Sequence, residues 1–85
     1  MVPPVRILLF ATARTAVGRA ELDWPVPAQG ITAKTLTREL AIAYPALART
    51  LGVSRFVRNG RYLARLTSRV RPGDEFAIHP PYGGG

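Results

Sequence analysis

The chain has 85 residues, of which 47% are hydrophobic, and it contains no cysteine. This length and composition predict one folded domain with a small core and exclude a disordered chain. Without cysteine there is no disulfide, no thiolate nucleophile and no cysteine-ligated metal site. The longest apolar run, residues 7–11, is far too short to cross a membrane, and the first residues lack the pattern of an export signal. We therefore expect a cytoplasmic protein without a membrane partner.

The net charge is +7, from eleven arginines and one lysine against five acidic residues. Six of the arginines fall between residues 55 and 71, a stretch that holds no acid. A strongly basic chain is compatible with nucleic acid as a partner, but the sequence contains no RNA-binding signature. Our first interpretation of the arginines is a solvated surface. A docking surface for an acidic protein comes second and nucleic acid third.

The first third of the chain predicts two strands. Residues 5–11 are rich in β-formers and largely apolar, as in a strand covered on much of both faces. Residues 12–18 are expected to form a turn or loop. Residues 20–26 alternate weakly and could pair with the first strand as a hairpin, with Pro25 favouring an edge position.

The only strong helical period runs over residues 31–44. Thr32 is a plausible N-cap, and Pro45 is expected to end the helix near Tyr44. Residues 46–51 predict a further short turn that stops at Gly52. The apolar stripe that should face the core consists of Leu36, Leu40, Ala43, Tyr44 and Leu47.

The remaining residues predict three more strands. Residues 53–57 and 61–64 flank Asn59-Gly60, the preferred pair for a two-residue hairpin turn. Pro72-Gly73-Asp74 predicts a turn, and residues 75–79 predict a last strand.

The expected order is β-β-α-β-β-β, which is an α+β fold with one main helix packed across one face of a mixed sheet. The first and last strands are expected to pair in parallel at the centre, because the long excursion between them supplies the crossover. This is the ubiquitin-like β-grasp arrangement. We expect residues 1–81 to form this domain and residues 82–85 to form a flexible glycine tail.

Alternation along the strands predicts which side chains lie on the open face of the sheet, away from the helix. In the first strand, the charged Arg6 should face away from the helix, so Leu8 and Phe10 should share the open face with it. In the last strand, Ala77 and His79 should lie on the open face, while Phe76 and Ile78 face the helix.

The sequence finishes with Pro80-Pro81-Tyr82-Gly83-Gly84-Gly85. Glycine has no side chain to bury and loses the most backbone entropy on ordering, so three glycines contribute nothing to a core. The pair of prolines fixes the direction of the chain before them. One expectation is a thin arm that carries a carboxylate into a narrow channel, and the other is a frayed end.

Three features, together with the long helix and the Asn59 hairpin, match one known family over essentially the whole chain. They are the opening Ile7-Leu8-Leu9-Phe10-Ala11, the turn Pro72-Gly73-Asp74-Glu75, and Pro80-Pro81 followed by Gly84-Gly85. The chain resembles the sulfur-carrier small subunits of molybdopterin synthase. It departs from them at His79, where an aromatic residue is frequent, and at Tyr82, where a smaller apolar residue is usual.

The resemblance implies that the C-terminal carboxylate of Gly85 is adenylated, converted to a thiocarboxylate, and donates sulfur to a cyclic pterin precursor to form the molybdopterin dithiolene. Residues Pro80, Pro81, Tyr82, Gly83 and Gly84 would then enter a partner's active site. The implied partners are the large subunit of molybdopterin synthase and an E1-like adenylating enzyme that binds the ATP. The carrier itself would hold no cofactor and no metal, and would be non-catalytic. Four residues match family positions that contact the large subunit: Phe10, Arg14, Tyr62 and His79.

Two other interpretations stay open. One is a sulfur carrier for thiamine or another thiolation, or a ubiquitin-like modifier. The other, which we favour less, is a small basic nucleic-acid-binding domain. His79 is the one histidine and has no cysteine or second histidine to complete a metal site or a catalytic triad. A surface position at the end of its strand is the simpler expectation for this side chain.

Overall fold

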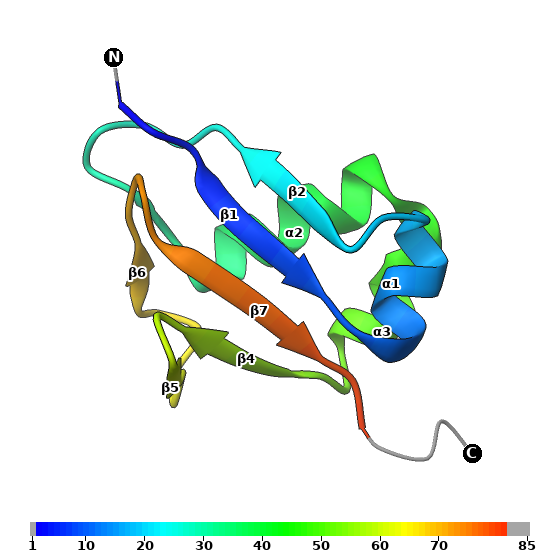
Figure 1. Cartoon of the computed structure of the whole chain (residues 1–85). Helices are drawn as coiled ribbons and strands as arrows, with labels where there is room; N and C mark the ends of the chain where they lie inside the picture. Colours follow the sequence, from blue (N-terminus) through cyan, green and yellow to red (C-terminus); the bar gives the residue numbers. More distant parts are fainter. Residues whose placement is uncertain (1, 82–85) are drawn as a thin grey trace.

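The computed structural model describes residues 2–81. In chain order the elements are β1 (Val5–Leu9), α1 (Ala11–Val17), β2 (Glu21–Trp24), β3 (Ile31–Thr32), α2 (Ala33–Ala43), a 3₁₀ turn η1 (Pro45–Leu47), α3 (Ala48–Leu51), β4 (Arg55–Arg58), β5 (Arg61–Tyr62), β6 (Arg69–Val70) and β7 (Glu75–His79). The main sheet lies in front of α2, which crosses its rear face, and α1 and α3 lie together at one end (Figure 1).

The main sheet has five strands in the order β2-β1-β7-β4-β5. The first and last strands, β1 and β7, pair in parallel at its centre, while β1–β2, β4–β7 and β4–β5 are antiparallel. The predicted α+β arrangement and its central parallel pair are therefore confirmed, and the fold is a β-grasp.

The core lies between the sheet and α2. In β1, Val5, Ile7 and Leu9 are buried while Arg6 is exposed, so the strand alternates as predicted. Burial of apolar side chains on one face drives this packing. The rest of the core comes mainly from β7, α2 and η1, through Phe76, Ile78, Leu36, Leu40 and Leu47.

Residues 12–18 do not form the predicted turn or loop. Residues 12–17 belong to α1, whose Ala13 is completely buried and whose Ala16 and Val17 pack against the core. The helix ends at Val17 and is capped by Gly18, whose left-handed φ of 82° lets its N–H bond to the Arg14 carbonyl at 2.7 Å. The first strand is shorter than predicted, because Ala11 takes a left-handed φ of 50° and turns the chain into α1.

Several other bounds differ from the predictions. The helix runs over Ala33–Ala43, with Thr32 as its N-cap, as predicted: the Thr32 Oγ1 accepts a bond from the Thr35 N–H at 3.1 Å. Ala43, predicted to face the core, is exposed. The strand predicted at 53–57 covers Arg55–Arg58, the one predicted at 61–64 covers Arg61–Tyr62, and the short pair β3–β6 was not predicted.

A group of polar contacts joins the β4–β5 hairpin to the turn before β7. The Asp74 carboxylate accepts bonds from the Arg58 Nε at 2.7 Å, the Asn59 Nδ2 at 2.9 Å and the Arg71 backbone N–H at 2.8 Å. We call Asp74, Arg58, Asn59 and Arg71 the Asp74 cluster. Partial burial raises the pKa of the Asp74 carboxyl, but the bonds from Arg71, Asn59 and Arg58 and the Arg58 charge together hold that pKa below its ordinary value of 3.8.

Gly30 is a position where a side chain does not fit. Its φ is 79°, and a Cβ added there would lie 2.4 Å from the Val70 carbonyl oxygen. We expect Gly30→Ala to lower the free energy of unfolding by about 2 kcal/mol, from left-handed strain and displacement of the β3–β6 pair. Gly18→Ala is the matched control, because Gly18 has a φ of 82° but nothing within 4 Å of an added Cβ. Equal losses in urea unfolding of the two variants would contradict the predicted clash.

None of the helices in the described part of the chain has both the length and the apolar character needed to span a bilayer.

Candidate functional site

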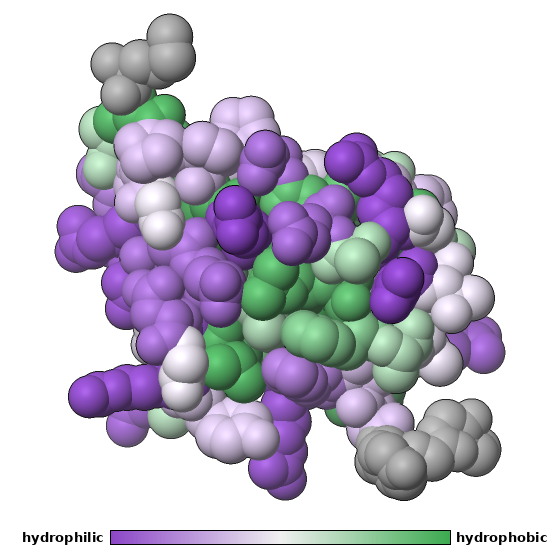
Figure 2. Space-filling view, in the orientation of Figure 1, coloured by the Kyte–Doolittle hydropathy of each residue, from purple (hydrophilic) through white to green (hydrophobic). Residues whose placement is uncertain are grey.

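The open face of the main sheet carries an apolar row that crosses four strands. The pairing places Leu8 of β1 opposite Ala77 of β7, Ala77 opposite Val57 of β4, and Val57 opposite Tyr62 of β5. Directly opposed residues share a face, so these side chains form a continuous strip. Figure 2 shows apolar surface at the centre of this face, bordered by hydrophilic surface. The predicted open-face placement of Leu8 and Ala77 agrees with this register.

Phe10 and His79 lie where β1 and β7 end, next to the start of the C-terminal segment. Their rings stack with centroids 4.5 Å apart and an interplanar angle of 9°. Phe10 is 42% exposed and His79 is also exposed, so the stack presents a flat aromatic surface to solvent. Such a contact contributes roughly 0.5–1.5 kcal/mol beyond burial of area. The stack therefore stabilises the end of β7, where the chain leaves the sheet.

Arg55 connects Tyr62 to the Phe10–His79 stack. The pairing of β4 with β7 sets Arg55 opposite His79, and the Arg55 guanidinium lies 6.0 Å from the centre of the Tyr62 ring. This distance permits a cation–π attraction. Tyr62 is 71% exposed, which makes it the most prominent aromatic side chain on the described surface. One hollow collects the residues around the exit of the chain: Val53, Arg55, Tyr62, His79, Pro80 and Pro81.

Arg14 lies apart from that hollow. It is exposed on α1 and borders a different hollow with Phe10 and Glu21. Phe10 thus separates Arg14 on one side from His79 on the other. The structure brings Phe10, His79, Tyr62 and the two prolines into one region, and it places Arg14 at the rim.

The charge of this region is positive. The ion pairs within residues 2–81 are Arg6–Glu21 at 3.9 Å and Arg58–Asp74 at 2.7 Å, so neither Arg14 nor Arg55 is neutralised there. Free guanidinium groups at a surface attract carboxylates and can bind them in a bidentate geometry. We call the open-face surface of Leu8, Phe10, Arg55, Tyr62 and His79 the tail-side surface.

No group of three or more histidine, cysteine, aspartate or glutamate side chains gathers at a point within residues 2–81. The predicted tail residues Tyr82, Gly83, Gly84 and Gly85 lie outside the described residues, and their roles stay predictions. Pro80 and Pro81 are described and continue directly from β7.

Comparison with known proteins identifies the family. The profile of the ThiS family matches residues 7–85. The chain belongs to the ThiS family. Two curated relatives of this ThiS-family chain, from Dictyostelium discoideum and Arabidopsis thaliana, are each named molybdopterin synthase sulfur carrier subunit. The first is 35% identical over 94% of this chain and 94% of its own length, and the second is 33% identical over 95% and 82%.

Solved structures resemble the ThiS-family chain in fold. The small archaeal modifier protein 1 of Haloferax volcanii superposes with a TM-score of 0.80 at 29% identity, covering 95% of this chain and 98% of that one. A molybdopterin converting factor subunit 1 from Pyrococcus furiosus gives 0.81 at 21% identity, covering 93% and 98%. In a complex of subunits 1 and 2 of the molybdopterin-converting factor of Helicobacter pylori, a chain gives 0.67 at 21% identity, covering 95% and 97%. These likenesses confirm the ubiquitin-like β-grasp fold of the chain.

Sequence reasoning missed Arg55 and Val53. Arg55 alternates with the buried Phe56, so alternation alone could have placed its side chain on the open face. Its position beside His79 depends on the register between β4 and β7, which no local pattern encodes. Val53 is 63% exposed and precedes β4, which begins two residues after the predicted start of this strand.

Proposed function

We propose that this ThiS-family chain is the sulfur-carrier small subunit of a molybdopterin synthase. The match of nearly the whole chain to two relatives with that name carries the proposal. The family profile extends through residue 85, so it includes the glycine segment that would hold the sulfur.

In the proposed reaction, the carboxylate of Gly85 attacks the α-phosphate of ATP in an adenylating enzyme, and pyrophosphate leaves. A sulfur nucleophile from a donor then attacks the acyl carbon, AMP leaves, and a thiocarboxylate remains on Gly85. In the large subunit this sulfur bonds to a carbon of the cyclic pterin precursor, and water cleaves the acyl–sulfur bond and restores the Gly85 carboxylate. A second loaded carrier supplies the other sulfur of the dithiolene. The chain would take part as a carrier, with ATP bound by the partner.

Residue types near the end suit this role. Four residues follow Pro81 in the sequence, and fully extended they could span about 13 Å at roughly 3.3 Å each. The folded domain could then dock outside an active site while the reactive carbon sits within it. Exclusion of water there would protect the adenylate and the thiocarboxylate from hydrolysis.

We further propose that the large subunit docks on the tail-side surface. The name of the Helicobacter pylori complex supports a partnership between the two subunits in a protein of the same fold. Aromatic and arginine side chains are enriched at interfaces, and Arg14 and Arg55 form no ion pair within residues 2–81. The adenylating enzyme would use the same region, since both partners must receive the same end of the chain.

The direct test is intact mass after incubation with an E1-like adenylating enzyme, ATP and a sulfur donor. The expected gain equals replacement of one oxygen by one sulfur, and subsequent addition of the large subunit and the pterin precursor should yield molybdopterin. No gain with any such enzyme would refute the carrier role. A gain without pterin conversion would refute the molybdopterin role and favour thiolation of thiamine or another acceptor, and attachment to lysines would favour a protein modifier.

Phe10→Ala is expected to weaken binding to the large subunit about tenfold, which is roughly 1.4 kcal/mol, because it removes the aromatic anchor and the support of His79. The variant should stay folded, although loss of the stack with His79 should lower its melting temperature by several degrees. Ile42→Ala is the control, because Ile42 is 74% exposed on α2, away from the tail-side surface. Calorimetric titration measures both affinities. Equal affinity of the two variants would show that Phe10 is not part of the interface.

A further inference from the structure

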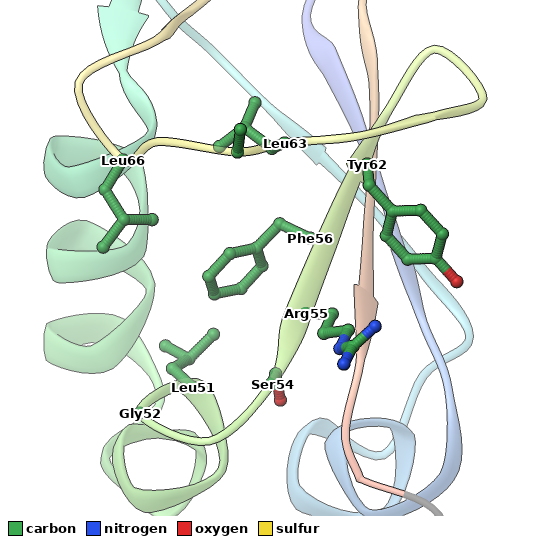
Figure 3. Close-up of a pocket in the computed structure, with 9 residues that line it drawn as sticks. Leu51, Gly52, Ser54, Arg55, Phe56, Tyr62, Leu63 and Leu66 are labelled. Carbon is green, nitrogen blue, oxygen red and sulfur yellow. The ribbon is translucent and has the colours of Figure 1, made fainter.

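A second apolar surface lies on the helix side of β4 and meets the tail-side surface at Arg55 and Tyr62, which line its edge. Phe56 points from β4 toward α2, whereas Tyr62 and Arg55 project to the other side of the strand (Figure 3). The hollow around Phe56 has a volume of about 440 Å³. Volumes of roughly 300–1,000 Å³ are usual for binding pockets. Its apolar lining comes from α3, β4 and the segment after β5, through Leu51, Phe56, Leu63 and Leu66.

The wall of this hollow is held by backbone bonds. The pairing of β5 with β4 ends at Tyr62, and the following segment crosses to the start of α2. There, the Lys34 N–H bonds to the Leu66 carbonyl at 2.9 Å, and the Ala33 N–H bonds to the Ser68 carbonyl at 2.9 Å. These bonds fix the backbone of Leu66, yet its side chain is 43% exposed. The hollow therefore stays open to solvent between two fixed walls.

The hollow continues along α2 into a neighbouring one of about 290 Å³, which shares Leu51, Phe56 and Leu66 with it. Its charged lining residues are Lys34 and Arg38, one helical turn apart on α2. Neither cation forms an ion pair within the described part of the chain. Glu39, the acid of α2, instead accepts a bond from the Trp24 Nε1 at 2.9 Å. The charged side chains that line the two apolar hollows are thus all positive.

We propose that this groove binds an acidic segment of a partner protein that carries large apolar side chains. We call Lys34, Arg38, Leu51, Phe56, Leu63 and Leu66 the helix-side groove. Leucine or phenylalanine side chains of the segment fill the hollow beside Phe56 and Leu66, and its carboxylates pair with Lys34 and Arg38. Removal of such apolar surface from water supplies affinity, and the charges select acidic over basic segments.

The apolar floor favours a peptide over a nucleic acid. A phosphate backbone would pair with Lys34 and Arg38 but would leave Leu63 and Leu66 uncovered. The hollow reaches Arg55 and Tyr62 of the tail-side surface at one edge, but Phe10 and His79 line neither hollow, so a bound segment leaves those two side chains free. A partner could therefore hold the chain here while its end is used elsewhere, and this proposal does not rest on the proposed function.

The test is a titration of the isotope-labelled full chain, observed through the backbone amides of the helix-side groove. The probe is a short synthetic peptide of leucine and phenylalanine among aspartates and glutamates, and its matched control replaces every acid by lysine. We expect shifts of the Leu51, Phe56, Leu63 and Leu66 amides with the acidic peptide, and at least about tenfold weaker binding of the basic one.

Two variants locate the contact. Leu66→Ser and Arg38→Glu should each weaken the acidic peptide at least about tenfold. Ile42→Ser and Arg49→Glu change exposed residues that do not line the groove, and these variants should bind the peptide as the unaltered chain does. Equal binding of both peptides, shifts confined to the tail-side surface, or preference for a single-stranded oligonucleotide over the acidic peptide would overturn the proposal.

Discussion

Removal of Gly84 and Gly85 is expected to abolish sulfur loading, reducing its rate by at least about a hundredfold. The proposed reactive group is the main-chain carboxylate of Gly85. The carboxylate of the shortened chain would end about 7 Å short of that position, at roughly 3.3 Å per residue. Catalysis depends on placing reacting atoms within a few tenths of an ångström to an ångström. Intact mass after incubation with the adenylating enzyme, ATP and a sulfur donor measures the loss.

The same deletion should leave the fold unchanged, because the core cluster consists of residues between Val5 and Ile78. Equal melting temperatures of the full and shortened chains would establish this. Gly84→Val is the companion variant, since it keeps the Gly85 carboxylate but adds a β-branched side chain near it. It should load more slowly than the unaltered chain and faster than the deletion. Full loading of the shortened chain would place the sulfur elsewhere and refute the role of Gly85.

Some elements could be predicted from the sequence because strong local signals frame them. The last strand covers Glu75–His79, as predicted, since a Pro-Gly-Asp turn precedes it and Pro80 follows it. Thr32 and Pro45 likewise mark the two ends of α2. In these places local propensity and tertiary packing favour the same structure.

Other elements could not be predicted because tertiary contacts decide them. The seven residues of α1 are too few to form a stable helix in isolation. Burial of Ala13 in the core stabilises the helix, and the local sequence carries no signal for that contact. The pair β3–β6 has two residues in each strand, too few for any periodicity. At the site, alternation predicted the face of Phe10 and His79, whereas their stacking and the nearness of Arg55 depend on strand register.

The Asp74 cluster explains a part of the hairpin that alternation leaves unexplained. The Asn59 side chain bonds both to Asp74 and to the Glu75 N–H, the latter at 2.8 Å. Asn59 and Gly60 have φ values of 49° and 83°, as a type I′ turn requires. One turn residue thus fixes the hairpin and ties it to the start of β7. The carboxylate at the centre of these bonds should be important for stability.

Asp74→Asn is expected to lower the free energy of unfolding by about 3 kcal/mol at neutral pH. The Asp74 side chain is 13% exposed and its partner Arg58 is 34% exposed, so solvent screens the pair only in part. An amide at this position keeps only one acceptor oxygen, so its NH2 group faces either the Asn59 Nδ2 or the Arg58 guanidinium, and at least one N–H is left without an acceptor. Urea unfolding at neutral pH measures the loss.

The loss should depend on pH in a direction set by the depressed pKa of Asp74. Because the folded-state pKa lies below the ordinary value of 3.8, the carboxylate contributes fully above that value and loses its contribution as pH falls through the folded-state pKa. The difference between the unaltered chain and Asp74→Asn should therefore be constant from neutral pH down to about pH 5 and shrink in more acidic solution.

Asp23→Asn is the matched control, since Asp23 is exposed on β2 and has no ion pair within residues 2–81. It should change the free energy of unfolding by no more than about 0.5 kcal/mol at any of these pH values. If Asp74→Asn kept its full loss in acid, the missing interaction would not be that of a carboxylate. The shape of the variant rather than its charge would then explain the destabilisation.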